Sequence, residues 1–182
     1  MFVSIICYLS PRTSINRQHM KSNQLLLCLL FFPYLIFAQI KLQWREQYPG
    51  IWKATVGQPE KISLLSTAGA IANVPALAKL PKSSFPLKQA EIDVKIIDHK
   101  VYLRFPLDQA EQLFGLGLNF QTVNQRGRIL DLHVDHYGAE DNGRTHAPVP
   151  FYVSSKGYGV LIDAARYLTV YVGTGVRRES QH

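Results

Sequence analysis

Short segments in which apolar and polar residues alternate recur along this chain. The clearest is the stretch 91–105, where apolar residues hold alternate positions on both sides of the polar sequence Asp98-His99-Lys100. A period of two is typical of a half-buried β-strand, so this stretch predicts a hairpin. The stretch 151–163 has the same pattern on either side of Ser155-Lys156-Gly157 and predicts a second hairpin.

Other segments fit the same class of structure. Residues 40–56 predict strand, turn and strand around Pro49-Gly50, and residues 128–134 and 167–172 predict single strands. Residues 67–89 contain three prolines and predict a loop with at most a helical turn, because proline interrupts helices and central strands. With no long amphipathic helix in the sequence, we expect an all-β fold, an antiparallel β-sandwich of about seven to ten short strands.

The first 38 residues have the pattern of a targeting segment rather than that of a strand. Met20-Lys21, the apolar run from Leu25 to Phe37 and then Ala38-Gln39 have the order of a secretory signal: a basic start, a short apolar run and a small residue at the cut. The run is shorter than the roughly 20 residues that a membrane-spanning helix needs. We therefore expect residues 1–38 to be an export signal with Met20 as its true start. Residues 39–182 would then be a periplasmic or extracellular domain, with no membrane association after signal removal.

Composition and charge narrow the function classes. The chain has 182 residues, 20 Lys and Arg against 13 Asp and Glu, and a formal net charge of +7. These charges are scattered rather than clustered, so we expect no nucleic-acid partner. Both cysteines, Cys7 and Cys28, precede the expected cut, which leaves a hydrophobic core and no disulfide to stabilise the mature domain. We expect no cofactor, since Gly115-x-Gly117 lacks the third glycine of a dinucleotide loop. Glycines in a strand more often mark a bulge or a close approach of two backbone segments.

Side chains of catalytic type gather in one region. They are Asp131, His133, Asp135 and His136, with Asp141 and His146 in the irregular stretch that follows. Three interpretations stay open for this cluster. It could bind a metal, although its spacing matches no established metal site. It could supply the pair of carboxylates that glycoside hydrolysis requires. Otherwise it is the polar face of an edge strand that leads into a substrate-lining loop, since loops of this length are commonly functional.

Aromatic and arginine side chains also admit two interpretations. Tyrosines recur late in the chain, at Tyr137, Tyr152, Tyr158, Tyr167 and Tyr171. They could form a surface that stacks on sugar rings or pack as core and cross-strand pairs. Arg126 and Arg128 flank Gly127 and are expected either as surface charges on a turn or as partners of carboxylates within the domain.

Four elements in the second half of the chain occur in a recognisable order. They are Phe114-Gly115-Leu116-Gly117, then Arg126-Gly127, then a strand that ends at Asp135, and finally Pro150-Phe151-Tyr152 with Gly157-Tyr158-Gly159-Val160. In this order the chain resembles the N-terminal β-sandwich of glycoside hydrolase family 31, which includes α-glucosidases and α-xylosidases. The resemblance is sharp over residues 113–173 and looser over residues 51–105. It implies a galactose mutarotase-like sandwich.

The resemblance also implies a function. In this family two Asp residues on a (β/α)₈ barrel carry out retaining α-glycoside hydrolysis, and a chain of 182 residues is too short to hold that barrel as well as the sandwich. We therefore expect no catalytic residue, no metal site and no activity in this chain alone. Its expected partners are an α-linked oligosaccharide or glycoside and the missing barrel of the full-length enzyme.

Within that enzyme the domain would act as a scaffold and as the wall of a substrate subsite. The substrate-binding residues implied by the resemblance are Asp135, His136, Asp141, Asn142, Arg144, Thr145 and His146. The alternative is a stand-alone carbohydrate-binding β-sandwich that works without a barrel.

Overall fold

The computed structural model describes residues 2–8, 41–57, 64–69, 71–119, 121–134 and 147–175. The strands of this part of the chain are β1 (Phe2–Tyr8), β2 (Arg45–Tyr48), β3 (Ile51–Lys53), β4 (Asp93–Ile97), β5 (Lys100–Pro106), β6 (Leu113–Gly115), β7 (Ile129–Leu132), β8 (Phe151–Ser154), β9 (Gly159–Leu161) and β10 (Leu168–Val172). Its helices are each about one turn long: α1 (Leu64–Thr67), α2 (Val74–Leu77) and the 3₁₀ turn Gln89–Glu91.

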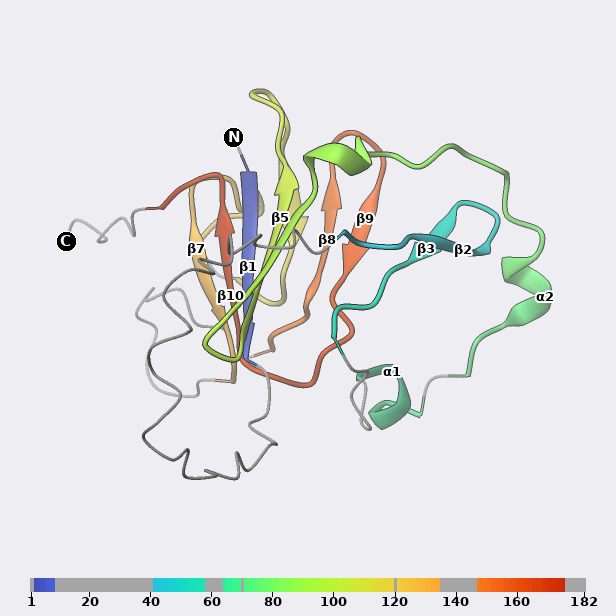
Figure 1. Ribbon diagram of the computed structural model, residues 1–182, viewed down its shortest axis with the longest axis horizontal. Helices are drawn as coiled ribbons and strands as arrows, with labels where there is room; N and C mark the ends of the chain where they lie inside the picture. Colours follow the sequence, from blue (N-terminus) through green and yellow to red (C-terminus); the bar gives the residue numbers. More distant parts are fainter. Residues whose placement is uncertain are drawn as a thin grey trace, which may run out of the picture.

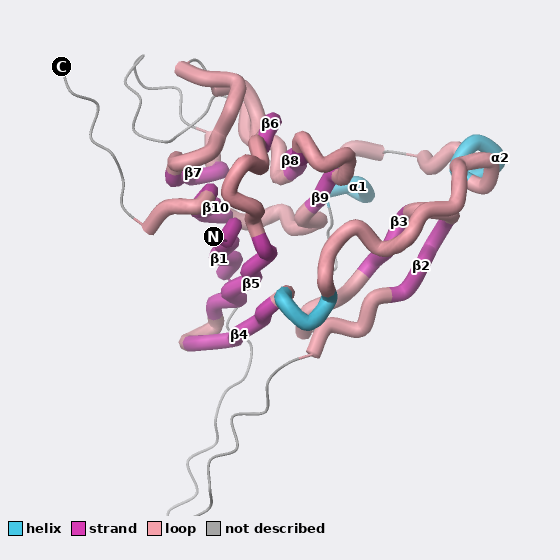
Figure 2. The backbone as a smooth tube through the Cα atoms, turned by 90° about the horizontal axis from the view of Figure 1, so that it is seen from above, coloured by secondary structure: helices cyan, strands magenta, loops and turns pink. Residues whose placement is uncertain are grey.

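The strands form two main antiparallel sheets and one separate hairpin. The larger sheet has the order β4-β5-β1-β10-β7, and the smaller one has the order β6-β8-β9. Figure 1 shows the two sheets side by side, with the β2-β3 hairpin beyond β9, and Figure 2 shows the same arrangement from above. The prediction of an all-β fold built from antiparallel sheets is confirmed.

The hydrophobic core lies between the two main sheets. Phe105 from β5, Leu130 from β7 and Val170 from β10 pack in one buried cluster with Leu113 from β6 and Tyr152 from β8. The buried residues hold alternate positions on β10, at Leu168, Val170 and Val172, and on β8, at Tyr152 and Ser154. Side chains on opposite faces of a strand alternate, so this pattern directs one face of each sheet inward.

Both predicted hairpins are present. β4 and β5 join through Asp98 and His99, whose φ angles of 47° and 62° are those of a two-residue hairpin turn that follows the right-handed twist of the strands. β8 and β9 join through a turn that contains Gly157, where φ is 83°. In each case the polar residues at the turn mark the reversal that the sequence predicts.

The segments before the β4-β5 hairpin have roughly the structure that the sequence predicts. The predicted strand, turn and strand around Pro49-Gly50 is the β2-β3 hairpin, although its first strand begins at Arg45 rather than near residue 40. The proline-rich stretch contains α2 and the C-terminal end of α1. Asn73 caps α2, because its side-chain oxygen accepts a hydrogen bond of 3.1 Å from the backbone N–H of Ala76.

Strand β1 was not expected from the sequence. Phe2–Tyr8 lies within the stretch assigned to the export signal, yet in the structure it forms a strand between β5 and β10. Residues 9–40, which include Met20 and most of the expected signal, lie outside the described residues. Export and the start at Met20 therefore stay predictions.

Candidate functional site

The predicted substrate loop is described only at its two ends. All seven expected substrate-binding residues, Asp135, His136, Asp141, Asn142, Arg144, Thr145 and His146, fall in the stretch 135–146 outside the described residues. Upstream of this stretch the described chain ends at Val134, shortly after β7, and it resumes at Ala147, shortly before β8. What the structure establishes is how the chain is held on either side of the loop.

The glycine motif holds the downstream end. From the last residue of β6 onward the backbone takes three successive positive φ angles, 111° at Gly115, 63° at Leu116 and 97° at Gly117. A side chain at Gly117 would collide with the carbonyl oxygen of Ala147 and lie 3.0 Å from the Cα of Pro148. The N–H of Leu118 donates a hydrogen bond of 3.1 Å to the same carbonyl. This motif is therefore not a phosphate loop, and its glycines permit the close backbone approach expected of glycines in a strand.

Strands β7 and β10 hold the upstream end. The two strands pair from Leu132 opposite Leu168 to Ile129 opposite Tyr171. The hydroxyl of Thr169 donates a hydrogen bond of 3.0 Å to a carboxylate oxygen of Asp131. The ring of His133 packs edge-on against Tyr167, with 5.2 Å between ring centroids. Asp131, in β7, is thus held by a residue of β10, and His133, just after β7, packs against the residue that precedes β10.

Tyr167 gives this end of the sheet an exposed aromatic surface. Its side chain is 70% exposed, whereas Tyr152 and Tyr158 are buried in the core. Tyr152 and Tyr158 are therefore core residues, Tyr171 is half-buried on β10, and Tyr167 is available at the surface. Tyr137 lies outside the described residues.

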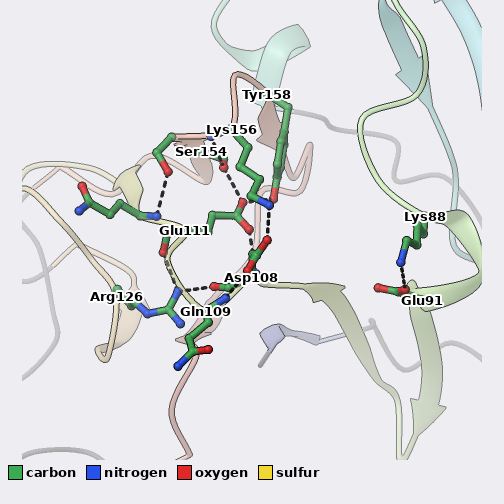
Figure 3. Close-up of polar contacts among 11 residues, drawn as sticks. Lys88, Glu91, Asp108, Gln109, Glu111, Arg126, Ser154, Lys156 and Tyr158 are labelled. Carbon is green, nitrogen blue, oxygen red and sulfur yellow. Dashed lines mark hydrogen bonds and ion pairs between the residues drawn. The ribbon is translucent and has the colours of Figure 1, made fainter.

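A buried carboxylate near the start of β6 was missed in the sequence. Glu111 is only 3% exposed. Its carboxylate accepts hydrogen bonds from the hydroxyl of Tyr158 at 2.6 Å, from the hydroxyl of Ser154 and from the N–H of Asp108 at 3.0 Å. Figure 3 shows these groups converging on Glu111 from the β8-β9 hairpin and from the chain before β6. A signal was present, because a period of two places Glu111 on the same inward face as Leu113.

Two charged side chains complete this polar cluster. Lys156, in the β8-β9 turn, forms an ion pair with the carboxylate of Asp108 (Figure 3). The guanidinium of Arg126 donates hydrogen bonds to the carbonyl oxygens of Asp108 at 2.9 Å and Glu111 at 2.6 Å. The cluster ties the chain before β6 to the β8-β9 hairpin, which is a structural role. Arg126 acts within the domain, where it bonds backbone carbonyls.

The environment of this cluster shifts several pKa values. Burial, reinforced by the hydrogen bond to Glu111, raises the pKa of Tyr158, and burial raises the pKa of Tyr152 well above its usual value. The hydrogen bond from Lys156 lowers the pKa of Asp108 and raises that of Lys156. Each shift favours the protonation state that the group holds at neutral pH. These residues therefore stabilise the fold and do not exchange protons near neutral pH.

The described residues contain no group of three or more His, Cys, Asp or Glu side chains arranged to bind a metal ion. Asp131 and His133 are present in this part of the chain, whereas Asp135, His136, Asp141 and His146 are not described. No helix of the described chain is long and apolar enough to cross a membrane.

Comparison with known proteins gives the family. Residues 44–170 match the model of the glycosyl hydrolase 31 N-terminal galactose mutarotase-like domain. The chain is 33% identical over 72 residues to an isomaltosyltransferase of Sporosarcina globispora, a match that covers 40% of this chain and 6% of the relative. It is 31% identical over 80 residues to the alpha-xylosidase XylQ of Lactiplantibacillus pentosus, covering 42% of this chain and 10% of the relative.

The two curated relatives are far longer than this chain, which spans a tenth or less of their length in these matches. The family match, by contrast, covers most of the chain and includes every strand from β2 to β9 together with the start of β10. The glycine motif, Arg126-Gly127 and the β8-β9 hairpin all lie within it. This chain belongs to the family of glycosyl hydrolase 31 N-terminal galactose mutarotase-like domains.

Proposed function

We propose that this chain is a non-catalytic domain of an exported retaining α-glycosidase and that its loop 135–146 forms one wall of a substrate subsite. The domain would be inactive alone, because the two carboxylates of the retaining reaction need a rigid scaffold that sets them about 5–5.5 Å apart. The expected scaffold is a separate (β/α)₈ barrel. The domain's own contribution is to position the loop.

The observation that carries this proposal is the contact between Gly117 and Ala147. A loop that contributes to a substrate subsite must be held in place at its base, because small misplacements of binding groups are costly in rate. Here the base is held by backbone, through the Leu118 N–H and the Ala147 carbonyl. Backbone contacts leave the side chains of the loop free to differ between enzymes of different specificity.

The names of the relatives support a proposal for the substrate class. An isomaltosyltransferase and an alpha-xylosidase are both similar to this chain. We therefore take α-linked glucosyl or xylosyl groups as the substrates of the enzyme to which this domain belongs. The residues proposed to contact them are those of the loop, above all Asp135 and Arg144, whose charged groups can bond sugar hydroxyls.

The test transfers the loop into an active relative. Residues 135–146 replace the corresponding loop of the alpha-xylosidase, and kcat/KM is measured for an α-xyloside and an α-glucoside. The expected result is a changed ratio between the two substrates. A matched graft of the turn Ser155–Gly157 should leave the ratio as it was. Equal ratios in the parent and both grafted enzymes would count against a subsite role.

A second function is favoured by Tyr167, which is exposed and packs edge-on against the half-buried His133. An exposed aromatic ring is a surface on which a sugar ring can stack. On this alternative the chain binds α-linked oligosaccharides without a barrel. Titration of the isolated chain with an isomaltose-series oligosaccharide would then give saturable binding, weakened by Tyr167→Ala or Arg144→Ala. A chain that shows no binding excludes this alternative and leaves the subsite proposal intact.

A further inference from the structure

We propose that residues 41–57 and 71–88, which we call the basic lobe, bind a polysaccharide that carries carboxylate groups. The site uses no residue of the loop 135–146. It goes beyond the subsite function because it concerns attachment to an acidic glycan and not the bond that the enzyme cleaves. A failure of either proposal leaves the other intact.

The basic lobe lies to one side of the two main sheets. Figures 1 and 2 both show β2, β3 and α2 beyond β9. The ring of Phe85 lies 4.9 Å from that of Trp44 and 5.4 Å from that of Trp52, measured between ring centroids. An isolated two-stranded hairpin is marginally stable, so these contacts help to hold β2 and β3 against the segment that contains Phe85.

The net charge of the chain is concentrated in this region. Residues 41–88 contain seven Lys and Arg and two Asp and Glu, a net charge of +5, whereas residues 89–175 contain eight against ten, a net charge of −2. Within the described part of the lobe, Glu46 is the only acidic residue. The basic residues there, all exposed, are Lys41, Arg45, Lys53, Lys79, Lys82 and Lys88.

The fold brings together basic residues that look scattered in the sequence. A Cβ at Gly50 would lie 3.0 Å from the hydroxyl oxygen of Ser83 and 3.4 Å from the carbonyl oxygen of Pro81. Lys82 lies between these two residues and is therefore close to the β2-β3 turn. The hairpin and the segment after α2 thus form one basic surface.

The centre of this surface is a pair of like charges. Arg45 on β2 lies directly opposite Lys53 on β3. Neighbouring residues of a strand point to opposite faces, and Trp52 faces Phe85, so Arg45 and Lys53 point to the other, exposed face of the hairpin. Like charges directly opposite each other destabilise an antiparallel pair. An anionic group bound between them would remove this repulsion.

The acidic residues of the described chain do little to neutralise the lobe. The carboxylate of Glu46 accepts a hydrogen bond of 3.1 Å from the N–H of Gly50, and Glu46 is opposite Trp52, on the face away from Arg45. Lys88 pairs with Glu91 at 3.1 Å. Among the described residues, the other five basic residues of the lobe form no ion pair. Their charges are available to a partner.

The kind of cation and the state of the aromatic rings indicate the partner. Five of the six basic residues of the described lobe are lysines. Lysine is a strongly hydrated point charge and is depleted at the centres of protein–protein interfaces. Trp44 and Trp52 are half-buried beside Phe85, which does not suit them to the stacking of nucleic-acid bases.

An extended anionic polymer fits such a surface, because attraction between many charges does not require a complementary shape. Among such polymers we choose an acidic polysaccharide, since the chain belongs to a family of glycosyl hydrolase domains. α2 is only one turn long, so it does not form the amphipathic helix with which many proteins enter a lipid surface.

The experiment measures binding of the full chain to polygalacturonate, an α-linked polymer with one carboxylate on each sugar. The test variant is Arg45→Gln with Lys53→Gln. The matched control is Lys95→Gln with Lys100→Gln, which removes the same charge from the β4-β5 hairpin. Dextran, a neutral α-linked glucose polymer, is the ligand control.

The unmodified chain should bind polygalacturonate at low ionic strength and more weakly as salt is added. Arg45→Gln with Lys53→Gln should raise the Kd about tenfold, and the control pair should change it by less than about twofold. Any affinity for dextran should be the same in all variants. The absence of binding to polygalacturonate, or equal losses in the test and control pairs, would overturn the proposal.

A second variant keeps the test valid if the hairpin variant does not fold. Lys79→Gln with Lys82→Gln lies outside the strands and should also weaken binding, by more than the control pair does. Unchanged binding in this variant would overturn the assignment of residues 71–88 to the site. Tighter binding to vesicles that contain phosphatidylglycerol than to polygalacturonate, lost in the same variants, would overturn the choice of a polysaccharide.

Discussion

The hydroxyl of Tyr158 donates a hydrogen bond of 2.6 Å to the carboxylate of Glu111, a residue 47 positions earlier in the chain. Both side chains are buried, and the bond links the β8-β9 hairpin to the segment before β6. A buried carboxylate is costly unless it is hydrogen-bonded, and here it has three donors. This pair makes the packing of the smaller sheet sensitive to single substitutions.

Glu111→Ala should strongly destabilise the domain. The substitution leaves the hydroxyls of Tyr158 and Ser154 and the N–H of Asp108 without their acceptor, at about 1–3 kcal/mol for each buried group left unpaired. Equilibrium denaturant unfolding measures the loss. The control is Glu91→Ala, which removes an exposed carboxylate paired with Lys88 at 3.1 Å and should change stability by less than about 1 kcal/mol. Equal effects of the two substitutions would contradict the structural role of Glu111.

Alkaline pH should destabilise the fold through the same pair. The pKa of Tyr158 is raised in the folded protein by burial and by the hydrogen bond to Glu111, against a usual value of 10.0. Above that value the unfolded chain releases the phenol proton while the folded chain keeps it, so stability is complete below pH 10 and falls as the pH rises further. The raised pKa of Tyr152 acts in the same direction.

Denaturant midpoints between pH 8 and pH 11 measure this dependence. Tyr158→Phe should be less stable at pH 8, because it loses the bond to Glu111, yet its stability should fall less steeply toward pH 11. A slope unchanged by Tyr158→Phe would assign the alkaline loss to other groups.

Gly117→Ala should disturb the predicted substrate loop more than Gly127→Ala does. Both Gly117 and Gly127 have left-handed φ angles, 97° and 83°, but an added Cβ meets the Ala147 carbonyl only at Gly117 and has open space at Gly127. Gly127→Ala therefore reports backbone strain alone, about 1 kcal/mol. Gly117→Ala adds a collision at the base of the loop. Limited proteolysis should cut residues 135–146 faster in Gly117→Ala than in Gly127→Ala, and equal rates would show that the contact does not hold the loop.

The outer face of the smaller sheet should promote association of the isolated chain. Phe151 and Leu161 lie opposite each other on β8 and β9, and Val153 lies beside them on the same face; their exposed fractions are 40%, 43% and 42%. Exposed apolar patches of this kind mark interaction surfaces or aggregation liabilities. Val153→Lys with Leu161→Lys should shift light-scattering mass toward the monomer. The control Ile97→Lys changes an equally exposed residue at the end of β4 and should leave the mass unchanged.

Local patterns in the sequence account for most of the strands. Alternation located the β4-β5 and β8-β9 hairpins, and turn residues such as Asp98 and Gly157 located their reversals, because both signals act between neighbours in the chain. The position of β1 could not be found in this way. Pairing of residues 2–8 with residues 100–106 and 168–172 is set by the whole sheet, and the apolar run after Met20 made the first residues look dispensable.

The polar network was equally hard to predict. Glu111, Tyr158 and Arg126 are far apart in the sequence, and their partners include backbone carbonyls that carry no sequence signal. The glycine motif could be interpreted only in part. A bulge or a close backbone approach was expected at Gly115 and Gly117, but the sequence did not show that Ala147 is the residue approached. The seven predicted substrate-binding residues lie outside the described chain, so their roles stay predictions.

The interior place of β1 also affects how the larger sheet folds. β1 pairs with a strand that lies far from it in the sequence, because Ser4 is opposite Tyr171. Contacts between such distant segments must overcome the entropy of closing a long loop, and they form slowly. The pairing of β1 with β10 should therefore be a slow step in the folding of the larger sheet, slower than the formation of the local β4-β5 hairpin.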